Sequence, residues 1–206
     1  MRKLVKFRLL KTVRSRDINV ENVGGLSMIE VRITKWMLEK AIHLAMIDKE
    51  RYGTRNTKSC MVSDNTRVTG KIGEVAISCY FNTELSDKED YDIIINQEHV
   101  EIKSRSIKSG IPKSHYRCDV NKPSIEFDRY IFVFVHSSYT KAWIVGTCSK
   151  EEFDYKSYYA CPLIKSRKTI PRYLIQIQDL EEVESWLTRL SRTVKVNGLM
   201  QRQADL

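Results

Sequence analysis

No long apolar segment stands out in the 206 residues, and neither does an amphipathic basic helix, which argues against a membrane as the partner. Several signatures of catalysis and nucleotide binding are also missing. There is no Gly-x-Ser-x-Gly elbow and no Gly-x-Gly-x-x-Gly, and Gly70-Lys71 is followed by isoleucine. The sequence therefore lacks the marks of an α/β-hydrolase nucleophile, a dinucleotide-binding turn and a P-loop.

The cysteines do not form a metal-binding or disulfide pattern. There is no Cys-x-x-Cys pair, and the nearest zinc half-site, His115-x-x-Cys118, has no second half. The four histidines are scattered along the chain. An odd number of unpaired cysteines predicts reduced thiols and a cytoplasmic setting. The five are Cys60, Cys79, Cys118, Cys148 and Cys161.

Basic residues exceed acidic ones, and the formal net charge is +9. Such a charge favours a polyanionic partner, and nucleic acid fits better than a membrane surface. With 42% hydrophobic residues the chain can bury one substantial core, so we expect one domain with terminal extensions.

The N-terminal region differs from the rest, with nine Lys or Arg up to Lys35 against three acidic residues. Lys6 and Arg8 interrupt any apolar core of a secretory signal. We expect residues 1–33 to be a loosely ordered basic arm, or an upstream extension of a chain whose core begins near Met28, with Gly24-Gly25 as a joint. The main domain is expected over residues 34–191 and a tail over residues 192–206.

Apolar spacing predicts the main elements. A helix is expected from about Lys35 to Tyr52, a second around Gly70 to Cys79, and buried strands over Ile131–Val135 and Ala142–Gly146. Ser149-Lys150-Glu151-Glu152 and Asp179-Leu180-Glu181-Glu182 read as capping boxes for two further helices. This pattern predicts an α/β fold in which helices cover a sheet.

The segment from Tyr91 to Lys103 contains the most informative pattern. Two β-branched runs, Ile93–Ile95 and Val100–Ile102, flank polar residues, which predicts a hairpin. A two-residue turn at Asn96-Gln97 places Asp92 opposite Glu101, whereas a three-residue loop shifts the pairing by one. Facing carboxylates are destabilising unless a cation neutralises them, and Lys103 shares the strand face of Glu101.

Asp92, eight intervening residues and then Glu101-Ile102-Lys103 resemble the core motif of the PD-(D/E)XK nuclease superfamily, and the resemblance covers roughly residues 35–150. Glu74, in Gly70-Lys71-Ile72-Gly73-Glu74, resembles the glutamate that such proteins often place on a preceding helix. Tyr91 stands where the motif has proline. The resemblance implies a restriction-endonuclease-like fold, which is α/β with a central mixed sheet and helices on both faces.

The same resemblance implies a Mg²⁺-dependent DNA endonuclease, with Mn²⁺ able to substitute. Asp92, Glu101 and the carbonyl of Ile102 would hold the ion, Glu74 would hold a second ion or a water, and Lys103 would orient or help deprotonate the attacking water. A homodimer is compatible with it, since many double-strand cutters use two copies of the site.

Five basic residues with no acidic residue among them lie between Lys103 and Arg117, which predicts a phosphate-tracking loop beside the site. A second basic group, Lys165, Arg167, Lys168 and Arg172, interrupts a tyrosine-rich region. The residues expected to contact nucleic acid are Lys71, Arg105, Lys108, Lys113 and Arg117.

Other interpretations of the same residues stay open. The hairpin carboxylates and Lys103 also fit a solvated sheet face, and Glu74 and Lys71 fit ordinary exposed helix positions. A catalytically inactive nucleic-acid-binding module on the same fold is the main alternative function. An unrelated basic protein that stacks RNA bases on its tyrosines is another.

Overall fold

The computed structural model describes residues 17–23, 26–52, 64–87, 91–108, 110–120, 127–160 and 172–191. The expected arm up to residue 16, the Gly24-Gly25 joint and the tail from residue 192 lie outside these ranges. So do three members of the second basic group, Lys165, Arg167 and Lys168.

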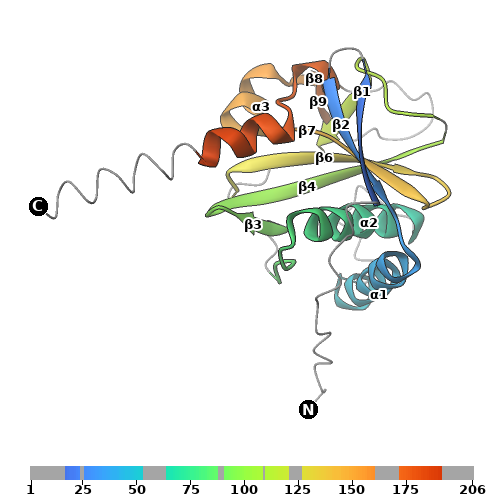
Figure 1. Cartoon of the computed structure of the whole chain (residues 1–206). Coiled ribbons are helices and arrows are strands. Elements are labelled where there is room, and N and C mark those ends of the chain that lie inside the picture. The colour runs from blue at the N-terminus through green and yellow to red at the C-terminus, as the bar shows by residue number, and fades with distance from the viewer. Residues whose placement is uncertain are drawn as a thin grey trace, which may run out of the picture.

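A mixed sheet of six strands forms the centre of the described chain (Figure 1). Its order is β1 (Ile18–Val23), β2 (Leu26–Arg32), β7 (Lys141–Ser149), β6 (Arg129–His136), β4 (Glu98–Ile107) and β3 (Ile93–Ile95). Only β4 and β6 pair in parallel; the other neighbours are antiparallel. Seven of the eight β6 residues are buried, as expected for a strand covered on both faces. The expectation of an α/β fold with a mixed sheet is therefore confirmed.

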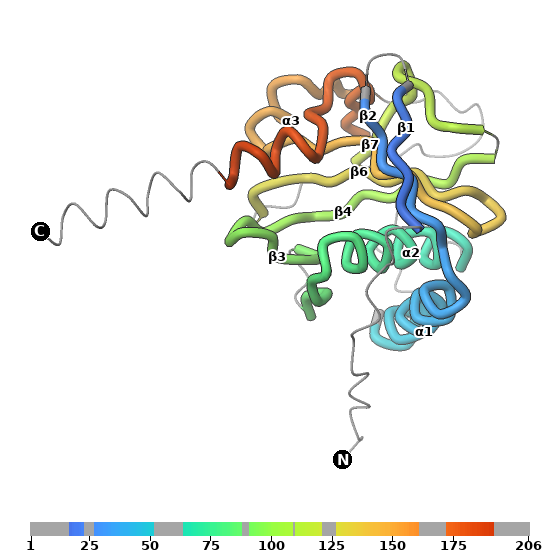
Figure 2. The backbone as a smooth tube through the Cα atoms, viewed as in Figure 1, coloured from blue at the N-terminus to red at the C-terminus, as the bar shows by residue number. Residues whose placement is uncertain are grey.

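The first two strands correct the expected domain boundary at residue 33. Figure 2 shows the chain of β1 and β2 running across one end of the sheet, where Ile29 of β2 pairs with Ile144 of β7. Met28, Ile29 and Val31 are almost fully buried. Residues 18–32 thus belong to the domain rather than to an arm, because an extended β2 satisfies the backbone edge of β7 and fills both cores.

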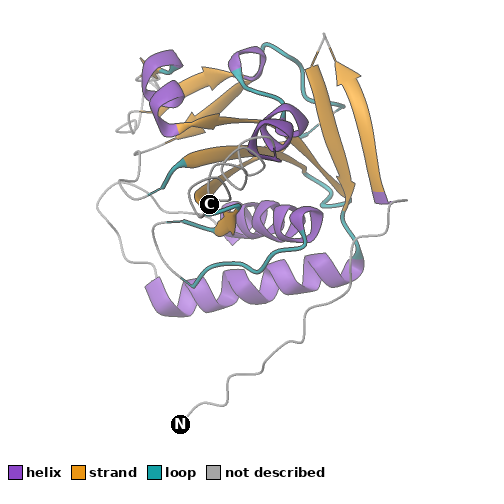
Figure 3. Cartoon of the chain, turned by 60° about the vertical axis from the view of Figure 1, so that its left-hand side comes forward, coloured by secondary structure: helices purple, strands orange, loops and turns teal. Residues whose placement is uncertain are grey.

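Two helices cover one face of the sheet. α1 (Lys35–Tyr52) spans the expected range, and α2 (Asp64–Phe81) begins several residues before the expected Gly70. Figures 1 and 3 show α2 between the sheet and α1. The apolar side expected for α2 is buried, and Ile72, Val75 and Ala76 enter a core that also contains Ile131 and Val133 of β6.

A second sheet covers most of the opposite face, in the order β5 (Arg117–Val120), β9 (Arg172–Gln176) and β8 (Tyr158–Ala160). Beside it lies α3 (Lys150–Lys156), whose predicted capping box is present: the Glu152 N–H donates to Ser149 Oγ, and the Ser149 N–H donates to the Glu152 carboxylate. The second core contains Phe153 of α3 and Phe132 of β6.

The other predicted capping box is wrong. Residues Ile177–Asp179 form a short 3₁₀ helix, Glu181 bridges to Thr147 of β7, and the last described helix starts only at residue 183. Its Val183 and Trp186 pack into the first core. Glu181 accepts instead from Arg129, whose side chain is 7% exposed and also donates to Glu98. Glu182, which the predicted box would turn back to the backbone of Asp179, instead accepts from the Ser27 N–H at 2.8 Å.

Candidate active site

The hairpin has the register of a two-residue turn. Ile93 pairs with Val100 and Ile95 with Glu98, and Asn96 and Gln97 both have positive φ. The two-residue turn, the first of the two loops expected from the sequence, is therefore confirmed, but the ladder ends at Ile93 and does not pair Asp92 with Glu101. Beyond Ile93 the strand departs from the ladder, because the Asp92 N–H donates to Val100 O at 3.0 Å.

The Asp92 side chain continues the edge of the sheet where the β3 backbone leaves it. Its Oδ2 accepts from the N–H of Ile102 at 2.7 Å, so a carboxylate oxygen takes the place of a strand carbonyl. Burial raises the pKa of Asp92 well above its ordinary value, and the nearby Glu74 and Glu101 raise it further; the Ile102 N–H and Lys103 lower it only in part. Asp92 is therefore a partly buried acid whose negative neighbours outweigh the positive charge around it.

Glu101 and Lys103 reach the site from the β4 face opposite α2. Val100 and Ile102, which alternate with them, pack in the core under α2. The Lys103 ammonium donates to Glu101 Oε1, and the Glu101 side chain is 14% exposed. The two thus form an ion pair at the end of the hairpin, within electrostatic reach of Asp92.

Glu74 approaches from the α2 face. Burial raises the pKa of Glu74, Lys71 opposes this rise, and Asp48 and Glu101 add to it. Because β3 is only three residues long, the two faces of the sheet meet at the Asp92 carboxylate, and Glu74 and Glu101 act on it from either side. The structure thus places Glu74, Glu101 and Lys103, three of the predicted residues, within electrostatic reach of the fourth, Asp92.

Gly73 allows the close approach of α2 to β4. A Cβ built on Gly73 would lie 3.0 Å from Ser104 Cβ and nearer still to Ser104 Oγ. A close approach of helix and strand is thus found at Gly73. It is not found at Gly70, where an added Cβ would meet nothing within 4 Å.

Lys71 has a different place from the one expected. Its ammonium lies 2.8 Å from Glu74 Oε2 and 2.9 Å from Asp48 Oδ2 of α1, and only 20% of the side chain is exposed. Burial alone would lower the pKa of Lys71, but the two carboxylates raise it above its ordinary value. Lys71 therefore holds Glu74 against α2 in this structure and is not presented to a phosphate.

Two residues near the site carried no signal in the sequence. Asp48 is one of several charged residues of α1, and only the packing of α1 on α2 brings it to Lys71. Tyr130 pairs with Glu101 across the parallel ladder, and its buried hydroxyl has no hydrogen-bond partner among the described residues. Burial, followed by the charge of Glu101, raises the pKa of Tyr130.

The expected phosphate-tracking residues after Lys103 are divided between two strands and the chain that connects them. Arg105 belongs to β4 and Arg117 to β5, and the Arg105 guanidinium donates to Arg117 O at 2.8 Å. Lys108 and Lys113 are exposed in the chain between these strands. Four of the five expected residues thus follow Lys103 in the chain, on β4, on β5 or between them. The fifth, Lys71, lies on α2.

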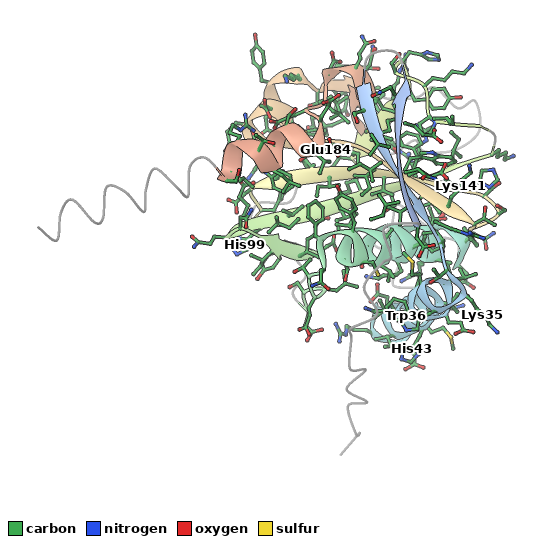
Figure 4. The ribbon with its side chains drawn as sticks, in the orientation of Figure 1. Lys35, Trp36, His43, His99, Lys141 and Glu184 are labelled. Atoms are coloured by element: carbon green, nitrogen blue, oxygen red, sulfur yellow. The ribbon has the colours of Figure 1, made fainter. Side chains whose placement is uncertain are left out.

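A divalent ion needs several oxygen ligands directed at one point. No three His, Cys, Asp or Glu side chains in the described ranges form a group arranged to hold a metal. The histidines do not gather either; Figure 4 shows His43 on α1 and His99 at the hairpin, far apart. Nevertheless, the mutual repulsion of Glu74, Asp92 and Glu101, with Asp92 partly buried and undercompensated, fits an oxygen-preferring cation.

Comparison with known proteins does not assign a family: no protein-family model matches the chain, and no curated protein matches it. None of the described helices is long and apolar enough to cross a membrane. Cys79, Cys118 and Cys148, the cysteines within the described ranges, are free thiols. Any function must therefore be argued from the site itself.

Proposed function

We propose that this chain is a Mg²⁺-dependent DNA endonuclease with a restriction-endonuclease-like fold. The observation that supports this most is the partly buried Asp92 carboxylate next to β3, whose pKa burial and the charges of Glu74 and Glu101 hold well above the ordinary value. Structural carboxylates are rarely placed together in this way, because each raises the free energy of the others' charged forms.

Asp92, Glu101 and the carbonyl of Ile102 would hold the ion, with Glu74 completing the set. When bound, Mg²⁺ or Mn²⁺ supplies positive charge that activates water and polarises the scissile phosphate. Lys103 is adjacent to Glu101 on the same strand face, where its ammonium can orient the attacking water and offset charge that develops on the phosphate. Lys71 keeps the Glu74 carboxylate directed into the site.

The exposed Arg105, Lys108, Lys113 and Arg117 would bind the DNA backbone. Phosphate contacts of this kind position a duplex without reading its sequence. The net charge of +9 supports a polyanionic partner in the same way.

The alternative is a catalytically inactive DNA-binding module on the same fold. One observation favours it: Glu101 is paired with Lys103 and Glu74 with Lys71, so two of the three carboxylates already have a cationic partner. Such a module would bind DNA equally well in Mg²⁺ and in EDTA and would cut none of its forms.

The deciding experiment incubates the full chain with supercoiled, linear, single-stranded and branched DNA, in Mg²⁺ and in EDTA. We expect Mg²⁺-dependent cleavage that is lost in Asp92→Asn and Lys103→Met. Asp154→Asn is the matched control, because Asp154 is an exposed carboxylate of α3 outside the site. An Asp92→Asn protein that cuts like the wild type would remove the assignment, and a wild type that cuts nothing would favour the binding module.

A further inference from the structure

The small sheet has one face turned away from the second core. Cys118 of β5 and Ile175 of β9 are buried in that core, and they pair with each other across the ladder. The neighbouring residues alternate to the other face, which carries Arg117 of β5, Leu174 of β9 and Tyr158 of β8. On this face Arg117 is exposed and Tyr158 is partly exposed.

Aromatic and guanidinium groups meet on that face. The Arg117 guanidinium lies 5.8 Å from the centre of the Tyr158 ring, so its side chain reaches across β9 between the two outer strands. Tyr158 is 39% exposed, and the next residue, Tyr159, is 58% exposed at the same sheet edge. A partly exposed ring beside an arginine suits a nucleobase that stacks while its phosphate meets the cation.

Contacts of Arg105 with β5 link the candidate active site to this face. Glu101, Lys103 and Arg105 alternate along β4 and therefore share one side of the strand. Lys103 and Arg105 line a small cavity together with Asp119 of β5, and the Arg105 guanidinium donates to Arg117 O. The order from the site outwards is Lys103, Arg105, Arg117 and Tyr158.

The charge along this path is positive despite one carboxylate. Asp119 forms an ion pair with Arg172 and lies 4.0 Å from the Arg105 guanidinium. Three guanidinium groups, those of Arg105, Arg117 and Arg172, therefore accompany a single acid. This excess of positive charge suits the phosphates of a DNA strand that crosses β5 towards β8.

We propose that the solvent face of the β5-β9-β8 sheet is a platform for an unpaired DNA strand, with Tyr158 as its stacking residue and Arg117 as its phosphate contact. Duplex bases are already stacked on one another, whereas unpaired bases have free faces for an aromatic ring. The proposal rests on the proposed nuclease function for the choice of DNA. It names the substrate class as DNA that carries a single-stranded branch or end beside the cut.

The test measures the binding of fluorescein-labelled oligo-dT, of an abasic oligomer of the same length and of a duplex, all in EDTA, by fluorescence anisotropy. We expect Tyr158→Ala to weaken oligo-dT binding by about 5- to 150-fold, the range for the loss of one stacked base. Binding of the abasic oligomer and the duplex should change little. Arg117→Met should weaken all three and reduce the salt dependence by about one phosphate contact.

Matched variants separate stacking from folding. Tyr158→Phe should keep the wild-type Kd, and Tyr155→Ala should have no effect, because Tyr155 is 90% exposed on α3 and outside the small sheet. A Tyr158→Ala protein that melts like the wild type and binds oligo-dT equally well would overturn the platform. So would a Tyr158→Ala protein that loses as much affinity for the abasic oligomer as for oligo-dT.

Binding in EDTA also separates this proposal from the nuclease. Tyr158-dependent oligo-dT binding by a protein that cuts nothing would keep the platform and remove the catalytic assignment. Mg²⁺-dependent cleavage, together with oligo-dT binding that does not depend on Tyr158, would keep the catalytic assignment and remove the platform.

Discussion

Replacing Lys71 by methionine tests how the Glu74 carboxylate is held. The change leaves Glu74 and Asp48, which are 14% and 28% exposed, without the ammonium that lies between them. Removing one partner of a fully buried ion pair costs about 3–5 kcal/mol. Because both acids keep some contact with water, we expect about 2–3 kcal/mol, which lowers the Tm by about 4–12 °C for a chain of this size.

The pH dependence gives the sign of the effect. Burial and the other carboxylates already raise the pKa of Glu74, and loss of Lys71 raises it further. An acid whose pKa is higher in the folded state destabilises the protein above that pKa, and the penalty disappears as the acid becomes protonated. The deficit of Lys71→Met should thus be largest near neutral pH and should shrink as the pH falls towards about 4.3, the ordinary pKa of glutamate.

The chain contains a matched control for this experiment. Lys49 and Asp64 form another α1–α2 ion pair at 2.8 Å, but their side chains are 52% and 68% exposed. Lys49→Met should therefore cost at most about 1 kcal/mol. Thermal melts of both variants in EDTA, over a series of pH values, measure the difference. The role given to Lys71 would be refuted if Lys71→Met had the same Tm as Lys49→Met. It would also be refuted if the loss of stability in Lys71→Met did not change with pH.

Three further predictions concern stability in EDTA. Gly73→Ala should lower the stability by about 1–3 kcal/mol because its Cβ would crowd Ser104, and Ser104→Gly in the same chain should restore most of the loss; an unchanged melt of the single variant would contradict this packing. Arg129→Met should cost about 3–5 kcal/mol, whereas Arg189→Met, with a 58% exposed side chain, should cost at most about 1 kcal/mol, and similar melts would contradict the difference in burial. Asp92→Asn keeps an oxygen for the Ile102 N–H and removes a charge beside two carboxylates, so its Tm should exceed that of the wild type by an amount that grows with pH; an equal Tm at high pH would count against the repulsion.

Local patterns in the sequence were sufficient where an element depends mainly on its own residues. The β-branched runs on either side of Asn96-Gln97 predict the hairpin, and Ser149 with Glu152 predicts the start of α3. The choice between a two-residue and a three-residue loop remained open, because Asn-Gln is a weak turn dipeptide. Burial of both Ile93 and Ile95 on the side of Val100 is consistent with the observed register.

Long-range pairing explains what the sequence did not predict. The strands over residues 18–32 lie beside a basic segment, and they are stabilised by pairing with β7, which is distant in the chain. The role of Lys71 depends likewise on Asp48, whose position follows from the packing of α1 on α2. Charged residues of a helix look alike in a sequence, and only tertiary contacts separate a buried pair from a solvated one.

Hydrogen bonds hold one oxygen of each of the three site carboxylates in place. Asp92 uses Oδ2 for the Ile102 N–H, Glu101 uses Oε1 for Lys103, and Glu74 uses Oε2 for Lys71. A carboxylate oxygen that accepts one hydrogen bond keeps a second lone pair, so these bonds fix the direction of each acid without using up its capacity as a ligand. In the proposed site, the carboxylates would therefore meet a cation already oriented, with oxygen ligands of the kind that Mg²⁺ prefers.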